Sequence, residues 1–195
     1  MVKFSAAYRL AAVDHRQETT TSTDPKFLTG TTRVDFRLIE DVLSEASMRH
    51  FTWRSDEPAE RGGMDTAPNP LSYFVSGLGF CQLVHFAGEA VRSGLTIDSL
   101  DMTLRGRFDR GKQRRFLEFI YDLRIDSPEP PEKIRTMVET AEQFCYVSNT
   151  LARSARLTGN VILNSQPLFT LTRGPDEATS TPSPVGPPSN EPITE

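Results

Sequence analysis

Residues 62–93 read GGMDTAPNPLSYFVSGLGFCQLVHFAGEAVRS, and this stretch decides the fold. No Asp, Glu, Lys or Arg occurs from Leu71 to Gly88, and the apolar residues there fall on every side of a helix. A helix that is apolar all round is a buried helix, so we expect this one at the centre of the molecule. Asn69 is the predicted N-cap and Pro70 the first helical residue. Asparagine accepts hydrogen bonds from free N–H groups, and proline has no N–H to leave unpaired.

The same run is not expected to span a membrane. A spanning helix needs about 20 predominantly apolar residues. This run is barely that long, and it contains three glycines together with Ser72, Ser76, Gln82 and His85. We therefore predict no membrane partner.

The composition is that of an ordinary globular protein. With 195 residues, 37% of them hydrophobic, the chain is long enough for one domain with appendages. Its net charge of −4 argues against a nucleic-acid partner, which would need a basic surface. The N-terminus lacks the apolar core of a signal peptide. Two cysteines without such a signal indicate reduced thiols and a cytoplasmic location.

Alternation of apolar and polar residues predicts strands before the central helix. We expect these strands at 3–12, 34–40 and 48–54, with the second of them half-buried. A polar turn is expected at 19–25.

After the central helix, Gly94 is expected to cap its C-terminal end. Strands at 100–108 and 117–125 follow, joined by a hairpin at 109–112. A second helix follows the proline-rich segment 127–131, and its apolar face carries Ile134, Val138, Ala141 and Cys145. A last strand or hairpin is marked by Val161, Leu163, Leu168 and Leu171. This order predicts an α+β fold, with helices packed on antiparallel sheet.

Residues 1–173 form the predicted domain, and residues 174–195 form a predicted proline-rich, disordered tail. The tail holds six of the fourteen prolines and no aromatic residue. Such a segment buries too little apolar surface to become ordered.

Cys81 in the central helix and Cys145 in the second helix leave two interpretations open. They are core cysteines that behave as small hydrophobic residues, or they are a reactive thiol and its resolving partner. A reactive thiol needs a positive neighbour that lowers its pKa, and the candidates are Arg61 and, second, Arg54. A metal site built from Cys81, His85 and Cys145 is disfavoured, because zinc usually takes three or four ligands with a supporting shell. We predict no metal and no cofactor.

Two further motifs have plainer explanations. Asp56-Glu57 before Pro58 suggests paired acid–base carboxylates, but a turn that ends a strand explains it better. Gly62-Gly63 lacks the spacing and the Lys-Ser/Thr pair of a phosphate loop.

Three segments together resemble the OsmC/Ohr family of osmotically inducible and organic hydroperoxide resistance proteins. They are the loop GGMDTAPNP at 62–70, the apolar helix with Cys81, and the segment AEQFCYVSNTL at 141–151. The resemblance covers residues 30–172 and includes the order of elements and the separation of the two cysteines.

The resemblance implies an OsmC-like fold, an intertwined homodimer with active sites at the subunit interface, and a thiol peroxidase activity. By this resemblance Cys81 is the peroxidatic cysteine that attacks an organic hydroperoxide. Cys145 is the resolving cysteine, and an external dithiol reduces the resulting disulfide. Arg61, with Arg54 as the second candidate, would lower the pKa of the thiol and orient the peroxide.

Two positions depart from the family pattern. Peroxidase members usually have a glutamate directly after the Asn-Pro pair, where it holds the arginine, whereas this chain has Leu71. Tyr146 stands where members commonly have proline. These departures keep an alternative open, in which a non-catalytic OsmC-like protein binds a small hydrophobic ligand at the dimer interface.

Overall fold

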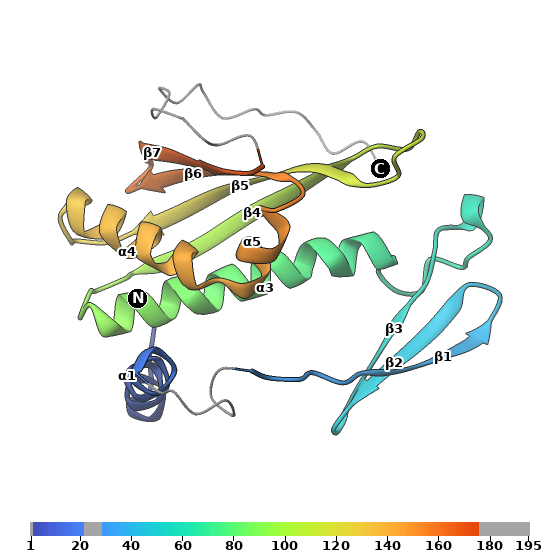
Figure 1. Ribbon diagram of the computed structural model, residues 1–195, viewed down its shortest axis with the longest axis horizontal. Helices are drawn as coiled ribbons and strands as arrows, with labels where there is room; N and C mark the ends of the chain where they lie inside the picture. Colours follow the sequence, from blue (N-terminus) through green and yellow to red (C-terminus); the bar gives the residue numbers. More distant parts are fainter. Residues whose placement is uncertain (1, 22–28, 176–195) are drawn as a thin grey trace.

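The computed structural model describes residues 2–21 and 29–175, with side chains at 2–13 and 29–175 (Figure 1). The helices are α1 (Ala6–Thr21), the short 3-10 helix η1 (Ala59–Arg61), α3 (Pro70–Arg92), α4 (Pro131–Phe144) and α5 (Tyr146–Leu151). The strands are β1 (Asp35–Glu40), β2 (Leu43–Met48), β3 (Phe51–Ser55), β4 (Ser99–Phe108), β5 (Phe116–Asp126), β6 (Arg156–Leu163) and β7 (Gln166–Arg173). This is the predicted α+β fold. The tail expected from residue 174 lies, from residue 176 onward, outside the described residues.

The central helix begins and ends as its sequence predicts. The side chain of Asn69 accepts a hydrogen bond from the backbone N–H of Ser72 at 2.8 Å, and Pro70 is the first helical residue. Just beyond the last turn, Gly94 has a φ of +64°, a left-handed conformation that suits glycine.

Strands β4 to β7 form one four-stranded sheet in sequence order. The pairs β4–β5 and β6–β7 are antiparallel, as expected. The pair β5–β6 is parallel, which the sequence did not indicate. Parallel neighbours need a long crossover connection, and α4 and α5 provide it.

The main core lies between this sheet and helices α3 and α4 (Figure 1). Alternate residues of β5 and the predicted apolar face of α4 both point into it. Its largest fully buried members are Phe86, Tyr121, Leu123, Ile125, Ile134, Met137 and Val138. The periodicity of both segments therefore predicted the right buried faces.

The predicted strand at 3–12 is wrong, because from Ala6 onward this segment forms the first turns of α1. Phe4 and Tyr8 fit one face of a strand, but they are also one helical turn apart, and their rings stack at 5.6 Å. The hydroxyl of Ser5 accepts a hydrogen bond from the N–H of Tyr8 at 3.1 Å, as an N-cap does. The first residues of the predicted turn at 19–25 continue this helix, and the others lie outside the described residues.

Strands β1, β2 and β3 form a separate antiparallel sheet. β1 lies where a strand is predicted, but all its residues are exposed rather than half-buried. The predicted strand at 48–54 is divided, because Arg49 turns the chain with a φ of +56° between β2 and β3. The sequence of β2, LSEASM, contains no β-branched or aromatic residue, and it therefore escaped prediction.

The three-stranded sheet stands apart from the body of the molecule (Figure 1). In the described part of the chain, no helix or strand packs extensively on it. One hydrogen bond, 2.7 Å long, joins the hydroxyl of Tyr73 on α3 to the carbonyl of Arg54 on β3. Several large apolar side chains of this sheet consequently face solvent in the single chain: Phe36, Leu38, Ile39 and Phe51.

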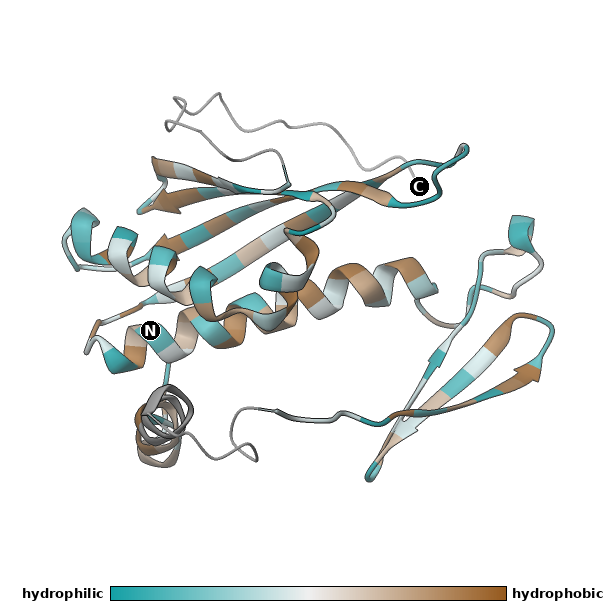
Figure 2. Cartoon of the chain, viewed as in Figure 1, coloured by the Kyte–Doolittle hydropathy of each residue, from teal (hydrophilic) through white to brown (hydrophobic). Residues whose placement is uncertain are grey.

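The predicted complete burial of α3 holds for only part of its surface. Leu78 and Phe86 are buried, whereas Phe80 is 70% exposed and Val84 is 63% exposed. Figure 2 shows hydrophobic residues along α3 and on the small sheet. By length and composition alone, α3 is apolar enough to cross a membrane, a property it shares with core helices. Its buried face belongs to the core beneath the sheet.

Candidate functional site

The glycine-rich loop before α3 is organised by Asp56, which is buried. Its carboxylate accepts hydrogen bonds from the hydroxyl and the N–H of Thr66, at 2.7 and 3.1 Å, and from the N–H of Met64 at 3.2 Å. These bonds, led by the Thr66 hydroxyl, hold the pKa of Asp56 below its usual value. A Cβ at Gly63 would collide with the carbonyl of Glu57. Asp56 therefore shapes the loop, as a turn-forming residue does.

The two candidate arginines bind carboxylates near this loop. Arg61 is exposed on η1, and its guanidinium lies 3.4 Å from the carboxylate of Glu57. Arg54 on β3 lies 3.3 Å from Glu45. Neither is among the main groups that shift the pKa of Cys81 within this chain.

Cys81 and Cys145 meet where α3 passes the bend between α4 and α5. Cys81 is half-buried on α3, Cys145 is fully buried, and both thiols are free. Cys145 has a φ of −73° and a ψ of 110°, which ends α4 and starts α5. Its sulfur accepts a hydrogen bond from the N–H of Ser148 at 3.4 Å, so Cys145 caps α5 while its thiol faces α3.

The pKa values of the two thiols are shifted in opposite directions. The hydrogen bond from Cys145 lowers the pKa of Cys81 to about 4; the His85 side chain and the backbone of Val147 act in the same direction, and burial opposes them. The same hydrogen bond and burial raise the pKa of Cys145. The surroundings therefore favour the thiolate form of Cys81 and the protonated form of Cys145.

His85 lies one turn after Cys81 on the same face of α3. Its ring centroid is 6.0 Å from that of Tyr146, the residue that follows Cys145. From the sequence we considered His85 only as a metal ligand or a core histidine, although its spacing to Cys81 signals a direct contact. Among the described residues, no group of three or more His, Cys, Asp or Glu could hold a metal ion.

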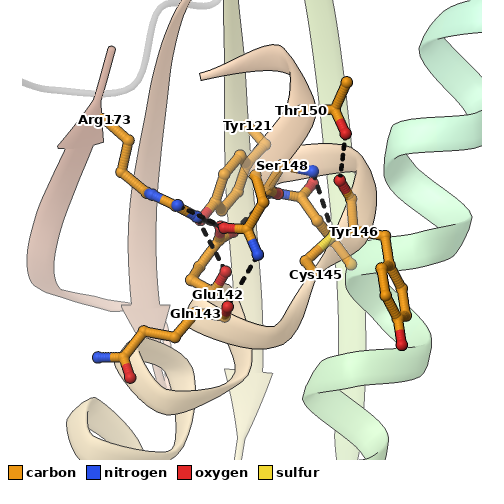
Figure 3. Close-up of polar contacts among 10 residues, drawn as sticks. Tyr121, Glu142, Gln143, Cys145, Tyr146, Ser148, Thr150 and Arg173 are labelled. Atoms are coloured by element: carbon orange, nitrogen blue, oxygen red, sulfur yellow. Dashed lines mark hydrogen bonds and ion pairs between the residues drawn. The ribbon is translucent and has the colours of Figure 1, made fainter. Parts of the chain in front are cut away.

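A buried polar network surrounds the bend, centred on Glu142, which is only 3% exposed (Figure 3). One carboxylate oxygen accepts hydrogen bonds from the amide of Gln82 and the hydroxyl of Tyr121, both at 2.7 Å. Arg173 on β7 lies 3.4 Å from the other oxygen and donates to the backbone carbonyl of Glu142 at 2.9 Å. Gln82 follows Cys81, so the network joins the two cysteine-bearing helices.

The same arginine fixes the start of α5 (Figure 3). Arg173 donates to the side-chain oxygen of Asn149 at 2.6 Å, and Asn149 donates to the carbonyl of Gln143 at 2.9 Å. β7 thereby holds both sides of the bend at Cys145. Sequence reasoning missed this network, although an acidic residue beside the apolar face of α4 was a signal for it.

Comparisons with known proteins agree with this architecture. Residues 63–159 match the family model of the OsmC-like proteins. No curated protein matches the chain. A solved OsmC-like protein from Mycoplasma pneumoniae is 23% identical with a TM-score of 0.63, and the match covers 69% of this chain and 97% of that protein.

Two solved organic hydroperoxide resistance proteins are also similar. The one from Legionella pneumophila is 17% identical with a TM-score of 0.50, covering 69% of this chain and 97% of that protein. The one from Elizabethkingia anophelis is 14% identical with a TM-score of 0.52, covering 69% and 96%. At these identities the likeness shows a shared fold. Residues 63–159, which match the family model, contain α3, both cysteines and the bend at Cys145, and this part of the chain is therefore an OsmC-like domain.

Proposed function

We propose that the protein reduces organic hydroperoxides, with Cys81 as the peroxidatic and Cys145 as the resolving cysteine. The observation that carries this proposal is the placement of the buried Cys145 thiol beside the more exposed Cys81, whose pKa it lowers. A thiolate is the nucleophilic form of cysteine, and a second thiol beside it is placed to resolve a sulfenic acid.

The proposed reaction has three steps. The Cys81 thiolate attacks the distal oxygen of the hydroperoxide, which leaves a sulfenic acid on Cys81 and releases an alcohol. The sulfur of Cys145 then displaces water from this sulfenic acid and forms an intrachain disulfide. An external dithiol restores both thiols by disulfide exchange.

An organic hydroperoxide suits this site better than hydrogen peroxide does. Phe80 and Val84 flank Cys81 along α3 and expose large apolar side chains. Burying the carbon chain of a substrate against them gains about 25 cal/mol per Å² of apolar surface. Hydrogen peroxide has no such surface to bury.

The proposal includes a homodimer. Exposed apolar side chains on α3 and on the small sheet form a surface that a single chain leaves open to water. Contiguous apolar patches of this kind mark interaction sites. A second copy that packed its small sheet over the exposed face of α3 would cover both.

Arg61 enters the proposal through this dimer. Cys81 lies eleven residues beyond the first residue of α3, which is about 16 Å along the helix axis from the end nearest η1. Arg61 would therefore serve the Cys81 of the other subunit, with Arg54 as the second candidate. The alternative function, binding of a small hydrophobic ligand at the dimer interface, is favoured by Leu71, which replaces the acidic side chain of peroxidase members.

The test treats reduced protein with cumene hydroperoxide. We expect loss of both free thiols and a Cys81–Cys145 disulfide detected by peptide mass spectrometry. Cys145→Ser should stop at a sulfenic acid on Cys81 that dimedone traps, and Cys81→Ser should keep its remaining thiol. If wild-type protein retains two free thiols in excess hydroperoxide, the peroxidase proposal is wrong and ligand binding replaces it.

A further inference from the structure

We propose that His85 is a catalytic residue of this site, whose imidazolium pairs with the Cys81 thiolate and gives its proton to the leaving oxygen of the hydroperoxide. This inference rests on the proposed function above. It assigns to a residue of the same helix the acid catalysis that the cysteines themselves do not supply.

The position of His85 supports the pairing. Residues four apart on a helix are neighbours on its surface, so His85 and Cys81 lie on one face of α3. After the larger effect of Cys145, the side chain of His85 also lowers the pKa of the Cys81 thiol. On its other side, the imidazole packs against the ring of Tyr146. His85 is thus held between Cys81 and the residue next to Cys145.

In the part of the chain whose side chains are described, the elements packed on α3 present few other proton donors to this face. The bend between α4 and α5 contributes Cys145 and Tyr146. The carboxylate of Glu142 on α4 is engaged by Gln82, on the neighbouring face of α3. β4 meets α3 at Gly79 with the apolar side chains of Met102 and Leu104.

The last neighbour is α1, which contacts α3 two turns further on, where Arg92 donates to the carbonyl of Ala12 at 3.0 Å. Among the side chains of α1 that the structure describes, Tyr8 is the one on which the charge of Arg92 acts. Tyr8 and Arg92 meet near the C-terminal end of α3, so among the described side chains neither competes with His85 beside the reacting sulfur.

The proposed first step balances as follows. A bond forms between the Cys81 sulfur and the distal, OH-bearing oxygen of the hydroperoxide, and the O–O bond breaks. The sulfur is oxidised by two electrons and becomes S–OH, while the departing alkoxide takes the proton of the His85 imidazolium and leaves as the alcohol. Without this proton the leaving group would be an alkoxide, a strong base that departs slowly.

The later steps return the proton. Neutral His85 takes the proton of Cys145 as its sulfur attacks Cys81, and passes it to the departing hydroxide, so that a disulfide and water form. Reduction by a dithiol then yields a disulfide of the reductant, the Cys81 thiolate, the Cys145 thiol and one proton. That proton recharges His85, and the cycle closes.

The experiment compares His85→Gln with His50→Gln, the same change at an exposed histidine in the turn before β3. The first readout needs no peroxide: the pH dependence of thiolate absorbance at 240 nm in reduced protein. Loss of an opposite charge beside the thiolate should raise the Cys81 pKa by about 1–3 units in His85→Gln. His50→Gln should titrate like wild type, and circular dichroism establishes that both variants fold.

The second readout separates acid catalysis from a merely structural role. Cumene hydroperoxide releases an alkoxide that needs a proton, whereas a peroxyacid such as 3-chloroperbenzoic acid releases a carboxylate that needs none. When each rate is corrected for the fraction of Cys81 present as thiolate, His85→Gln should slow the reaction with cumene hydroperoxide by about 10²- to 10⁴-fold. The reaction with the peroxyacid should change little.

The outcomes are distinct. Suppose that wild-type protein forms the disulfide, and that His85→Gln slows its reactions with the two oxidants by the same factor or slows neither reaction. His85 is then not the acid, and the peroxidase proposal stands. An unchanged Cys81 titration in His85→Gln overturns the ion pair. If wild-type protein reacts with neither oxidant, the proposed function itself fails.

Discussion

Removing the carboxylate of Glu142 tests whether the buried network holds the two cysteine-bearing helices together. In Glu142→Ala, the amide of Gln82 and the hydroxyl of Tyr121 lose their acceptor, and both side chains are fully buried. A buried donor without a partner costs about 1–3 kcal/mol of stability, so the two unpaired donors together cost roughly 2–6 kcal/mol. Arg173 is 30% exposed and can turn to water, so its unpaired charge adds little.

We therefore expect the free energy of unfolding to fall by about 3–5 kcal/mol, the middle of the range for two unpaired buried donors. For a chain of this size, that corresponds to a melting temperature lower by roughly 6–20 °C. Urea denaturation at one fixed protein concentration measures the change, because the stability of the proposed dimer would depend on concentration.

Glu139→Ala is the matched control, since it makes the same change one turn earlier on α4. Glu139 is 50% exposed, and its carboxylate lies 3.7 Å from a nitrogen of Arg135. Exposed pairs of this kind contribute about 0–1 kcal/mol. If Glu142→Ala loses no more stability than Glu139→Ala, the network does not stabilise the site and our account of it is wrong.

Three further predictions concern the thiolate, the dimer and the sheet. Cys145→Ala removes a hydrogen bond to a charged sulfur, worth about 1.5–3 kcal/mol, and should raise the Cys81 pKa by about 1–2 units. The pKa of Cys81 in the wild type is depressed to about 4, so its thiolate persists above that pH and is lost below it. In Cys145→Ala, the pH at which iodoacetamide begins to alkylate Cys81 should therefore be higher. If that pH does not change, Cys145 does not hydrogen-bond the Cys81 thiolate. Phe80→Glu places a charge on the exposed apolar face of α3 and should shift sedimentation from dimer towards monomer, whereas a wild-type protein that sediments as a folded monomer at micromolar concentration refutes the dimer. Gly159→Ala places a methyl group against the tyrosine ring that covers this glycine, and should lower the free energy of unfolding in urea by about 1–3 kcal/mol. The control Gly30→Ala, whose methyl group meets no atom within 4 Å, should lower it far less. Equal effects of the two changes would show that the ring moves aside freely.

Most of the secondary structure after residue 69 was predictable because its causes are local. Asn69 and Pro70 define the start of α3 through bonds that span three residues. The apolar spacing of Ile134, Val138 and Ala141 identifies the buried face of α4. The N-terminal region was predicted less well, since Phe4 and Tyr8 fit either a strand or a helix. The short, polar β2 carries no strand signal of its own.

The candidate site was predictable only in part. Both cysteines stand out in the sequence, but their relation depends on a contact between segments 64 residues apart, and no spacing rule sets the acidity of either thiol. Arg61 was chosen for its place in the chain, and within a single chain its side chain lies beside Glu57. Histidine 85 could have been linked to Cys81 from its helical spacing alone.

The sequence by itself determined the α+β class, the central helix with its caps, and the inward faces of β5 and α4. These follow from capping, periodicity and turn chemistry, which act over a few residues. Only the tertiary structure decided which groups meet: the parallel pairing of β5 with β6, and the convergence of Gln82, Tyr121 and Arg173 on Glu142. It also decided that α3 keeps an exposed apolar face, because burial depends on what packs against a helix as well as on the residues it carries.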